Sequence, residues 1–214
     1  MNSLAYTIEL LSDALPASGM IFSATIDTDI VVDDQGLPYV PAKRIKGLLL
    51  ESLTEVGEMS GILPQLDRLF GTVGKPNSES FFVSEGRMQN YSSFYDWIKW
   101  AKDEHPEEFQ PESIIETFTR IRRQTRLEKG VAKEHSLRTV RVLNKGHVFE
   151  GTVSKAGGFD QIERAQLALA FSNLRYFGLN RNRGFGHIHC ALLDEKGEGF
   201  DLVAALALCR EVLS

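Results

Sequence analysis

Cationic side chains gather in one central stretch of this chain. Between Thr119 and Gly146, nine basic residues stand against two acidic ones, although the whole chain of 214 residues carries a formal net charge of −5. Such a run is often no more than a solvated face, but it is also the electrostatic footprint expected where nucleic acid binds. The nine basic residues are Arg120, Arg122, Arg123, Arg126, Lys129, Lys133, Arg138, Arg141 and Lys145.

Three further basic residues, Lys43, Arg44 and Lys46, follow the proline-bearing segment 36–41. The second proline of that segment, Pro41, is suited to the start of a helix. Basic residues in a first helical turn oppose the helix dipole at a cost of roughly 0.3 to 1 kcal/mol each. Free backbone amides at a helix start bind anions, so these cations predict a docked phosphate. The alternative is that their long side chains extend into solvent at little cost.

The segment 178–186 has glycines at both ends and polar donors between them. It follows a helical pattern and enters a strand, whereas the glycine loops of dinucleotide-binding and P-loop folds run from a strand into a helix. Its backbone can approach a ligand closely, so we expect contacts with phosphate or sugar. The alternative is an ordinary turn. The candidate residues are Asn180, Arg181, Asn182, Arg183, Gly184 and Gly186.

Two carboxylates, Asp27 and Asp29, alternate with apolar residues before the proline-bearing segment. Carboxylates beside a cationic track can hold a divalent metal such as Mg²⁺ or Mn²⁺, or assist removal of the proton from a ribose 2′-OH. The pattern leaves Asp27 equally open to a role as a capping or turn residue. His135 and His147 lie in the basic stretch and are candidate general bases.

The elements that would position these residues follow a recognisable order. Apolar periodicity predicts strand, helix, strands, helix, strand, which is the order of an α+β, ferredoxin-like (RRM-like) βαββαβ core. We expect one domain over 1–214, with a helical insertion at about 88–120 and a basic thumb-like or guide-facing region at about 120–147. The expected elements are a strand over 4–11, a helix after Pro41, a short strand over 81–83, two strands over 140–153 turning near 144–146, a helix ending at Gly178, a strand over 186–193 and a last helix capped by Asp201.

Composition excludes several classes of protein. Hydrophobic residues make up 43% of the chain and charged residues 25%, as in globular proteins. No apolar run approaches the roughly 20 residues that cross a bilayer. The N-terminus lacks the basic region of a signal peptide, and two cysteines are too few for a disulfide scaffold, so we expect a cytoplasmic protein.

Several sequence blocks together resemble the RAMP superfamily of CRISPR-associated proteins. Gly36-Leu-Pro-Tyr-Val-Pro-Ala-Lys-Arg-Ile-Lys-Gly47 is similar to its "G-x-P-Y-I-P-x-S-S-x-K-G" block, and Leu69-Phe-Gly71 to the "LFG" that follows. Segments 130–140 and 146–151 resemble the central region of type III backbone subunits, and Arg183-Gly-Phe-Gly186 the end of the family's glycine-rich loop. Within the family the chain looks closest to the type III-D branch, where Lys-Arg replaces the Ser-Ser pair.

The resemblance implies a prokaryotic subunit that lies along a CRISPR guide RNA, beside other RAMP subunits and a large polymerase-like subunit, and that meets the target RNA. An Asp before the "PYIP" block cleaves target RNA with a divalent metal in such subunits, and it falls on Asp27. The basic residues at 43–46, Arg181 and Arg183 match positions expected to face the guide. Arg126, Arg138 and Arg141 lie in the thumb or guide-facing strand.

Two alternatives stay open within this resemblance. Catalytic relatives commonly read Asp-x-Pro where this chain reads Asp27-Thr-Asp29, and relatives that cap the 5′ tag of the guide share the fold without cleaving. The chain is therefore either a metal-dependent endoribonuclease subunit or a structural or capping one. The other alternative is a standalone guide-processing ribonuclease that uses His135 or His147. It is disfavoured because such enzymes usually contain two copies of the fold.

Overall fold

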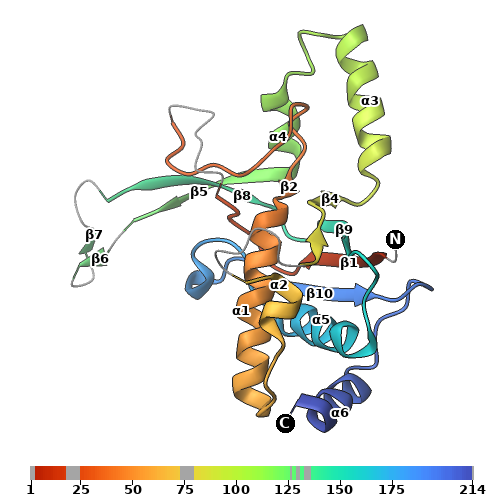
Figure 1. Ribbon diagram of the computed structural model, residues 1–214. Helices are drawn as coiled ribbons and strands as arrows, with labels where there is room; N and C mark the ends of the chain where they lie inside the picture. The colour runs from red at the N-terminus through yellow and green to blue at the C-terminus, as the bar shows by residue number, and fades with distance from the viewer. Residues whose placement is uncertain are drawn as a thin grey trace.

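The computed structural model describes residues 3–17, 25–72, 80–125, 127–128, 131–132 and 136–213. Its largest sheet is antiparallel, with the strand order β10-β1-β9-β4-β2 (Figure 1). The first strand, β1 (Ser3–Leu10), lies inside this sheet between β10 (Ile188–Leu193) and β9 (Val148–Ser154). The first strand of the chain therefore has a hydrogen-bonded partner along both of its edges.

Burial alternates along β1. Leu4, Tyr6, Ile8 and Leu10 are each at most 2% exposed, whereas the residues between them are exposed or half-buried. This period of two places one face of the strand against the core, as the apolar pattern predicts. The Tyr6 ring stacks on Phe171 with the ring centroids 5.3 Å apart, which joins the sheet to a helix beneath it. The expected strand over 4–11 is confirmed at 3–10.

The far side of the sheet is built from short strands. β4 (Gly86–Met88) pairs with β9 and with β2 (Tyr39–Val40), and β3 (Phe82–Val83) also pairs with β9. When β1, β4, β9 and β10 are counted as the core strands, their spatial order is 4-1-3-2, with every neighbour antiparallel. The α+β class is thereby confirmed, and the order is consistent with the expected ferredoxin-like core.

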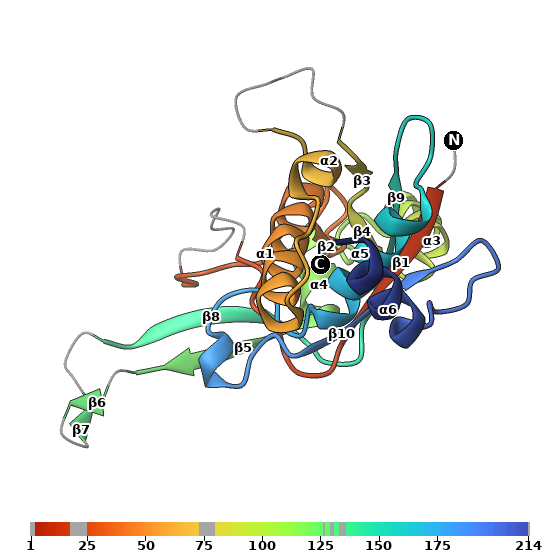
Figure 2. The same cartoon turned by 60° about the horizontal axis from the view of Figure 1, so that its bottom comes forward.

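Two helices cover the buried face of this sheet. They are α1 (Ala42–Ser60) and α5 (Gln161–Asn173), which lie next to each other in both views (Figures 1 and 2). Ile45, Leu49 and Leu53 of α1 are completely buried, so the apolar stripe predicted after Pro41 is confirmed. The short α2 (Leu66–Phe70) follows α1.

The start of the last helix is set by a side-chain cap, and the end of α5 is set by a backbone pairing that follows it. The last helix, α6 (Leu202–Leu213), begins as predicted, with the Asp201 carboxylate accepting the amides of Val203 and Ala204 at 3.0 and 3.1 Å. The helix expected to end at Gly178 instead ends at Asn173. The reason is that the chain after it runs antiparallel to the segment leading into β10, with Tyr176 bridged to His187.

Residues between β4 and β9 form a helical part and a hairpin that extend away from the sheet (Figure 1). The helical part consists of α3 (Tyr91–Glu104) and α4 (Pro111–Phe118). The hairpin pairs β5 (Thr119–Gln124) with β8 (Arg138–Leu143), and β6 (Leu127–Glu128) pairs with β7 (Val131–Ala132) nearer its tip.

The two strands predicted over 140–153 exist, but they do not pair with each other. β8 belongs to the hairpin and β9 to the central sheet, and the turn at 144–147 carries the chain from one sheet to the other. They are separate because β8 forms its backbone hydrogen bonds with β5, whereas β9 forms its own with β1. Among the described residues, no helix combines the length and the apolar character that crossing a membrane requires.

Candidate nucleic-acid interface

The β5–β8 hairpin is mostly buried along β8 and carries exposed arginines along β5. Val140 to Leu143 of β8 are buried, whereas Arg120, Arg122 and Arg123 of β5 are exposed. Arg138 at the start of β8 is exposed as well, and it pairs in register with Gln124. The hairpin is therefore anchored at its base by apolar packing and carries arginines along its outer part.

Asp13 fixes the base of this hairpin. Its carboxylate accepts hydrogen bonds from Arg120 Nε at 2.8 Å and from Arg122 Nη2 at 3.0 Å, and from a second Arg120 nitrogen, Nη2. Lys145 N also donates to it, at 3.3 Å. Burial opposes ionisation of Asp13, but these donors outweigh it and hold the pKa of the carboxyl below its ordinary value. Two arginines of the basic stretch thus share one carboxylate, which offsets one of their two positive charges.

Asp27 is bonded to the edge of β8. Its amide donates to the Thr139 carbonyl oxygen at 2.8 Å, and its carboxylate oxygen Oδ2 accepts the Thr139 amide at 2.6 Å. The Asp27 side chain is nevertheless exposed. The carboxylate therefore lies on the surface, beside the residue that follows Arg138.

Asp29 takes the opposite orientation. It is 1% exposed, and its Oδ1 lies 3.1 Å from Nε of Arg141, which is itself 6% exposed. The same oxygen accepts the amide of Ile30 at 2.9 Å. The two carboxylates predicted to hold a metal therefore do not share one surface, because only Asp27 is exposed. Arg141, expected on a guide-facing strand, has its side chain in the interior because it compensates the buried charge of Asp29.

The segment 178–186 is held against the core by backbone hydrogen bonds. Leu179 N donates to the Leu15 carbonyl oxygen at 2.9 Å, and Gly186 N to that of Asp13 at 2.7 Å. Between these anchors lies η1 (Arg181–Arg183), a single 3-10 turn with exposed side chains. The amide nitrogen Nδ2 of Asn180 donates to Oε1 of Gln124 at 3.3 Å, which joins this segment to the hairpin. Asn182 and Gly184 are exposed at its tip.

The basic residues at the start of α1 differ in what they contact. Lys43 is exposed. Lys46 donates to the Phe81 carbonyl oxygen at 2.9 Å, and its ammonium lies 5.0 Å from the centre of the Phe81 ring. Arg44 donates through Nη2 to the Ala17 carbonyl oxygen at 2.6 Å. Partial burial lowers the pKa of both Arg44 and Lys46.

One nitrogen of Arg44 has no partner in the described part of the chain. Its Nη1 is buried and makes no hydrogen bond there, which is costly for a charged group. The first turn of α1 contains no acidic residue and no side-chain cap. An anion at this helix start would complement the helix dipole, as the sequence pattern predicts.

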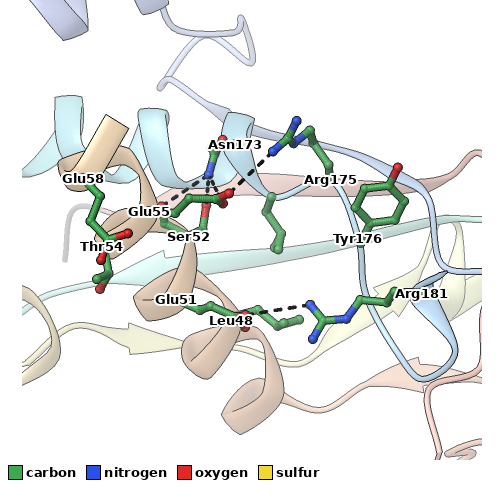
Figure 3. Close-up of a pocket in the computed structure, with 11 residues that line it drawn as sticks. Leu48, Glu51, Ser52, Thr54, Glu55, Glu58, Asn173, Arg175, Tyr176 and Arg181 are labelled. Carbon is green, nitrogen blue, oxygen red and sulfur yellow. Dashed lines mark hydrogen bonds and ion pairs between the residues drawn. The ribbon is translucent and has the colours of Figure 1, made fainter. Parts of the chain in front are cut away.

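A groove links η1 to α1. Its cavity of about 480 Å³ is lined by α1 on one side and by residues 173–176 and Arg181 on the other (Figure 3). Arg181 lies 3.9 Å from Glu51, and Arg175 lies 3.7 Å from Glu55. Glu55 also accepts a hydrogen bond from Asn173 at 2.8 Å. Carboxylates of α1 therefore lie within ion-pair distance of one arginine in η1 and of one arginine before the loop.

These contacts bring the hairpin and the segment 178–186 together, next to the side of α1 that carries Glu51. The hairpin, η1 and α1 lie side by side in both views (Figures 1 and 2), joined through Asn180 and through Arg181. We call the exposed arginines of the hairpin and η1 that are not bonded to Asp13 the basic track; they are Arg123, Arg138, Arg181 and Arg183. Lys43 is also exposed, but it lines a cavity beside β3. A track of arginines on a rigid base is suited to the phosphates of a nucleic acid, because such contacts need charge but no sequence reading.

The described residues contain no group of three or more His, Cys, Asp or Glu side chains arranged to hold a metal ion. The exposed carboxylate of Asp27 still fits one mode of binding. Mg²⁺ commonly keeps several waters and takes only one or two protein carboxylates together with substrate phosphates. Asp29 fits less well, because its charge is compensated by Arg141.

Two predicted residues, Arg126 and His135, lie outside the described residues. The other candidate base, His147, packs edge-on against Phe118 with ring centroids 5.6 Å apart. Its Nε2 is buried without a partner among the described residues, and burial lowers its pKa. Asp13 is a residue that the sequence patterns missed. A lone aspartate in a loop gives no periodic signal, and only the fold brings it to two arginines more than 100 positions away.

Comparison with known proteins identifies a family and a fold. The model of the RAMP superfamily matches residues 7–189. A chain of "Cryo-EM structure of the Type III-B Cmr-beta bound to cognate target RNA" superimposes with a TM-score of 0.62 at 11% identity, covering 90% of this chain and 97% of that one. A chain of "Type III-B Cmr-beta Cryo-EM structure of the Apo state" gives 0.61 at 11% identity, covering 90% and 98%. No curated protein matches the sequence.

Proposed function

The chain belongs to the RAMP superfamily, and on that premise we propose that it is a guide-RNA-binding subunit of a type III CRISPR effector complex in antiviral defence. Its fold is that of chains from a type III-B complex, one of which was solved with cognate target RNA. The Lys43-Arg44 pair, in place of Ser-Ser, favours the type III-D branch. A complex of this kind works in the prokaryotic cytoplasm.

The main support for the proposal is the hydrogen bond that connects the segment of η1 to the hairpin. Asn180 bonds to Gln124, and Gln124 pairs in register with Arg138, so the arginines of η1 and of β8 lie on adjoining elements. Arg138 and Arg183 are both exposed. They would contact guide phosphates, while base pairing between guide and target supplies sequence specificity. Other RAMP subunits and a large polymerase-like subunit would complete the complex.

Within this function we propose Asp27 as the residue for metal-dependent cleavage of target RNA. Its carboxylate is exposed beside β8, and its loop is fixed by two bonds to Thr139. Asp27 would hold a Mg²⁺ or Mn²⁺ ion together with RNA phosphate oxygens and water. Such an ion would stabilise charge on the phosphate and activate the attacking oxygen. Asp29, also a predicted ligand, orients the loop in this structure through its ion pair with Arg141.

The alternative, a structural or tag-capping subunit without cleavage, is favoured by one contact. One oxygen of the Asp27 carboxylate accepts the Thr139 amide at 2.6 Å, which already gives the side chain a structural task. The standalone processing enzyme has less support, because the ring of His147 packs against Phe118 and its Nε2 is buried away from any RNA.

Asp27→Asn separates the two remaining functions. Asparagine retains an oxygen that can accept the Thr139 amide but removes the charge that a metal needs. We expect the complex assembled with this variant to bind guide and target RNA as before and to lose Mg²⁺-dependent cleavage of the target. Thr28→Ser, a change in the same loop, serves as the control and should cleave normally. Full cleavage by the Asp27→Asn complex would assign the chain the structural role.

The proposed RNA-binding function is tested separately by copurification. When the chain is coexpressed with a guide RNA and the remaining subunits of its complex, guide RNA should be recovered with it. A complex that assembles without contacts between this chain and the RNA, as judged by crosslinking, would contradict the proposal.

A further inference from the structure

An apolar groove lies between the two helices of the insertion, away from the basic track. It has a cavity volume of about 590 Å³ and is lined by side chains of α3, α4 and the connection between them. The aromatic rings pack edge to face, with Trp97 and Phe109 centroids 5.4 Å apart and Phe94 and Phe118 centroids 6.2 Å apart. Trp97 is 52% exposed and Phe94 38%, so large apolar surfaces remain open to solvent.

The two helices that form this groove, and the connection between them, are acidic. Residues 91–118 contain seven carboxylates and two lysines. All seven carboxylates are exposed, and none of them forms an ion pair within the described part of the chain. The seven are Asp96, Asp103, Glu104, Glu107, Glu108, Glu112 and Glu116. Because these carboxylates have no ion-pair partner in the described part of the chain, their charge remains available to a partner of opposite charge.

Helical spacing places part of this charge beside the groove. Glu112 and Glu116 are four residues apart on α4 and form a stripe adjacent to Ser113 and Thr117, which line the groove. Glu108 lines the groove itself, in the connection between the helices. The surface therefore combines an aromatic floor with an acidic border.

We propose that this groove binds a basic amphipathic helix of a partner protein. Apolar residues at i, i+3, i+4 and i+7 of such a helix would lie against Trp97 and Phe94, and its Lys or Arg residues would meet the acidic stripe of α4. Nucleic acid does not fit, because the border would repel phosphates. The inference is independent of the RNA-binding function, since it concerns a different surface of the same subunit.

The first test uses the full-length protein and a synthetic helical peptide. The probe is a fluorescein-labelled peptide about four turns long, with leucines at i, i+3, i+4 and i+7 and lysines elsewhere. Fluorescence anisotropy should show saturable binding that weakens with added salt. A peptide with the same leucines and with glutamates in place of lysines should not bind. Equal binding of both peptides would overturn the proposal.

Two tryptophans of α3 offer a matched pair of variants. Trp97 lines the groove and is 52% exposed, whereas Trp100 is 56% exposed and does not line it. We expect Trp97→Ala to weaken binding of the lysine peptide by about tenfold or more. Trp100→Ala should change it by less than about twofold. Equal effects of the two substitutions would mean that the peptide binds elsewhere.

Two charge-reversing double variants test the acidic stripe in the same way. Glu112→Lys/Glu116→Lys should abolish binding of the lysine peptide, because the stripe beside the groove becomes basic. Asp96→Lys/Asp103→Lys changes the same number of charges on the side of α3 that faces away from the groove, and should retain most of the binding. Loss of binding in both double variants would mean that the peptide responds only to the net charge of the protein, which would contradict binding in the groove.

The remaining outcomes identify a different occupant. Sedimentation of the unmodified protein at increasing concentration should show no self-association through this surface. Self-association that disappears in Trp97→Ala would make a second copy of the chain the occupant. RNA binding should be unchanged in Trp97→Ala, and a loss would assign the groove to RNA. Either result overturns the proposal, and circular dichroism confirms that each variant is folded.

Discussion

The carbonyl oxygen of Asp13 accepts the amide of Gly186 at 2.7 Å, while the carboxylate of the same residue accepts hydrogen bonds from two arginines of β5. One residue thereby fixes both the hairpin and the segment that carries η1. The relative position of the arginines of the basic track depends on this connection. Its removal should disturb the interface without removing any of the cations themselves.

Asp13→Asn should destabilise the protein in a pH-dependent way. The side chain keeps its size but loses the charge that Arg120 and Arg122 bind, and we expect a loss of about 1 to 3 kcal/mol at pH 7. The folded-state pKa of Asp13 is lowered from the ordinary value of 3.8. Its contribution is therefore complete above that value and disappears as the pH falls through the folded-state pKa.

Urea unfolding at pH 7 and near pH 3 measures this difference. The gap in unfolding free energy between the unmodified protein and Asp13→Asn should narrow at the lower pH. A difference in unfolding free energy that is the same at both pH values would show that the ion pairs of Asp13 with its arginines do not stabilise the fold.

Arg141→Met should cost far more stability than the same change at Arg138. Arg141 is buried against Asp29, and removing one partner leaves a buried charge uncompensated, at a cost of about 3 to 5 kcal/mol. Arg138 lies on the same strand but is exposed, so Arg138→Met should stay within about 0.5 kcal/mol. Thermal or urea unfolding compares them, and comparable losses would contradict the interior ion pair.

The double variant Asp29→Asn/Arg141→Met tests the pairing itself. Because both charges are removed together, the double variant should lose less unfolding free energy than the sum of what the two single variants lose. Additive losses would mean that the two side chains do not interact.

Two glycines near η1 should differ in their tolerance of a side chain. Both have a left-handed backbone, with φ of 80° at Gly184 and 73° at Gly186. A Cβ at Gly184 meets nothing within 4 Å, whereas a Cβ at Gly186 would lie 1.9 Å from the Phe177 carbonyl oxygen. Gly184→Ala should therefore cost about 1 kcal/mol and Gly186→Ala about 3 kcal/mol or more. Unfolding free energies that fall in the reverse order would contradict this packing.

Much of the fold could be predicted because periodic signals are local. The alternation from Leu4 to Leu10 and the apolar stripe after Pro41 each report which face is buried, and both are confirmed. The partner of a strand is not a local property. The pairing of β8 with β5 rather than β9 depends on residues 119–124, whose arginines give no apolar alternation.

The site was harder to predict, for a related reason. Charge clusters show which residues are cationic but not which of them the fold places in ion pairs. Arg120, Arg122 and Arg141 look no different in the sequence from Arg123 and Arg138, yet carboxylates from distant segments bind the first three. Asp29 likewise resembles Asp27 in pattern, but burial separates them.

The central claim is that the basic track binds the phosphates of RNA, and the salt dependence of binding tests it most directly. The affinity of the double variant Arg138→Ala/Arg183→Ala for single-stranded RNA should be measured against salt concentration. The control is Lys99→Ala/Lys196→Ala, which removes two exposed lysines outside the track.

If the track contacts phosphates, the slope of log K against log salt should decrease by about 0.7 for each lost contact in Arg138→Ala/Arg183→Ala and remain unchanged in the control. An unchanged slope in Arg138→Ala/Arg183→Ala, or an equal decrease in the lysine control, would contradict the account.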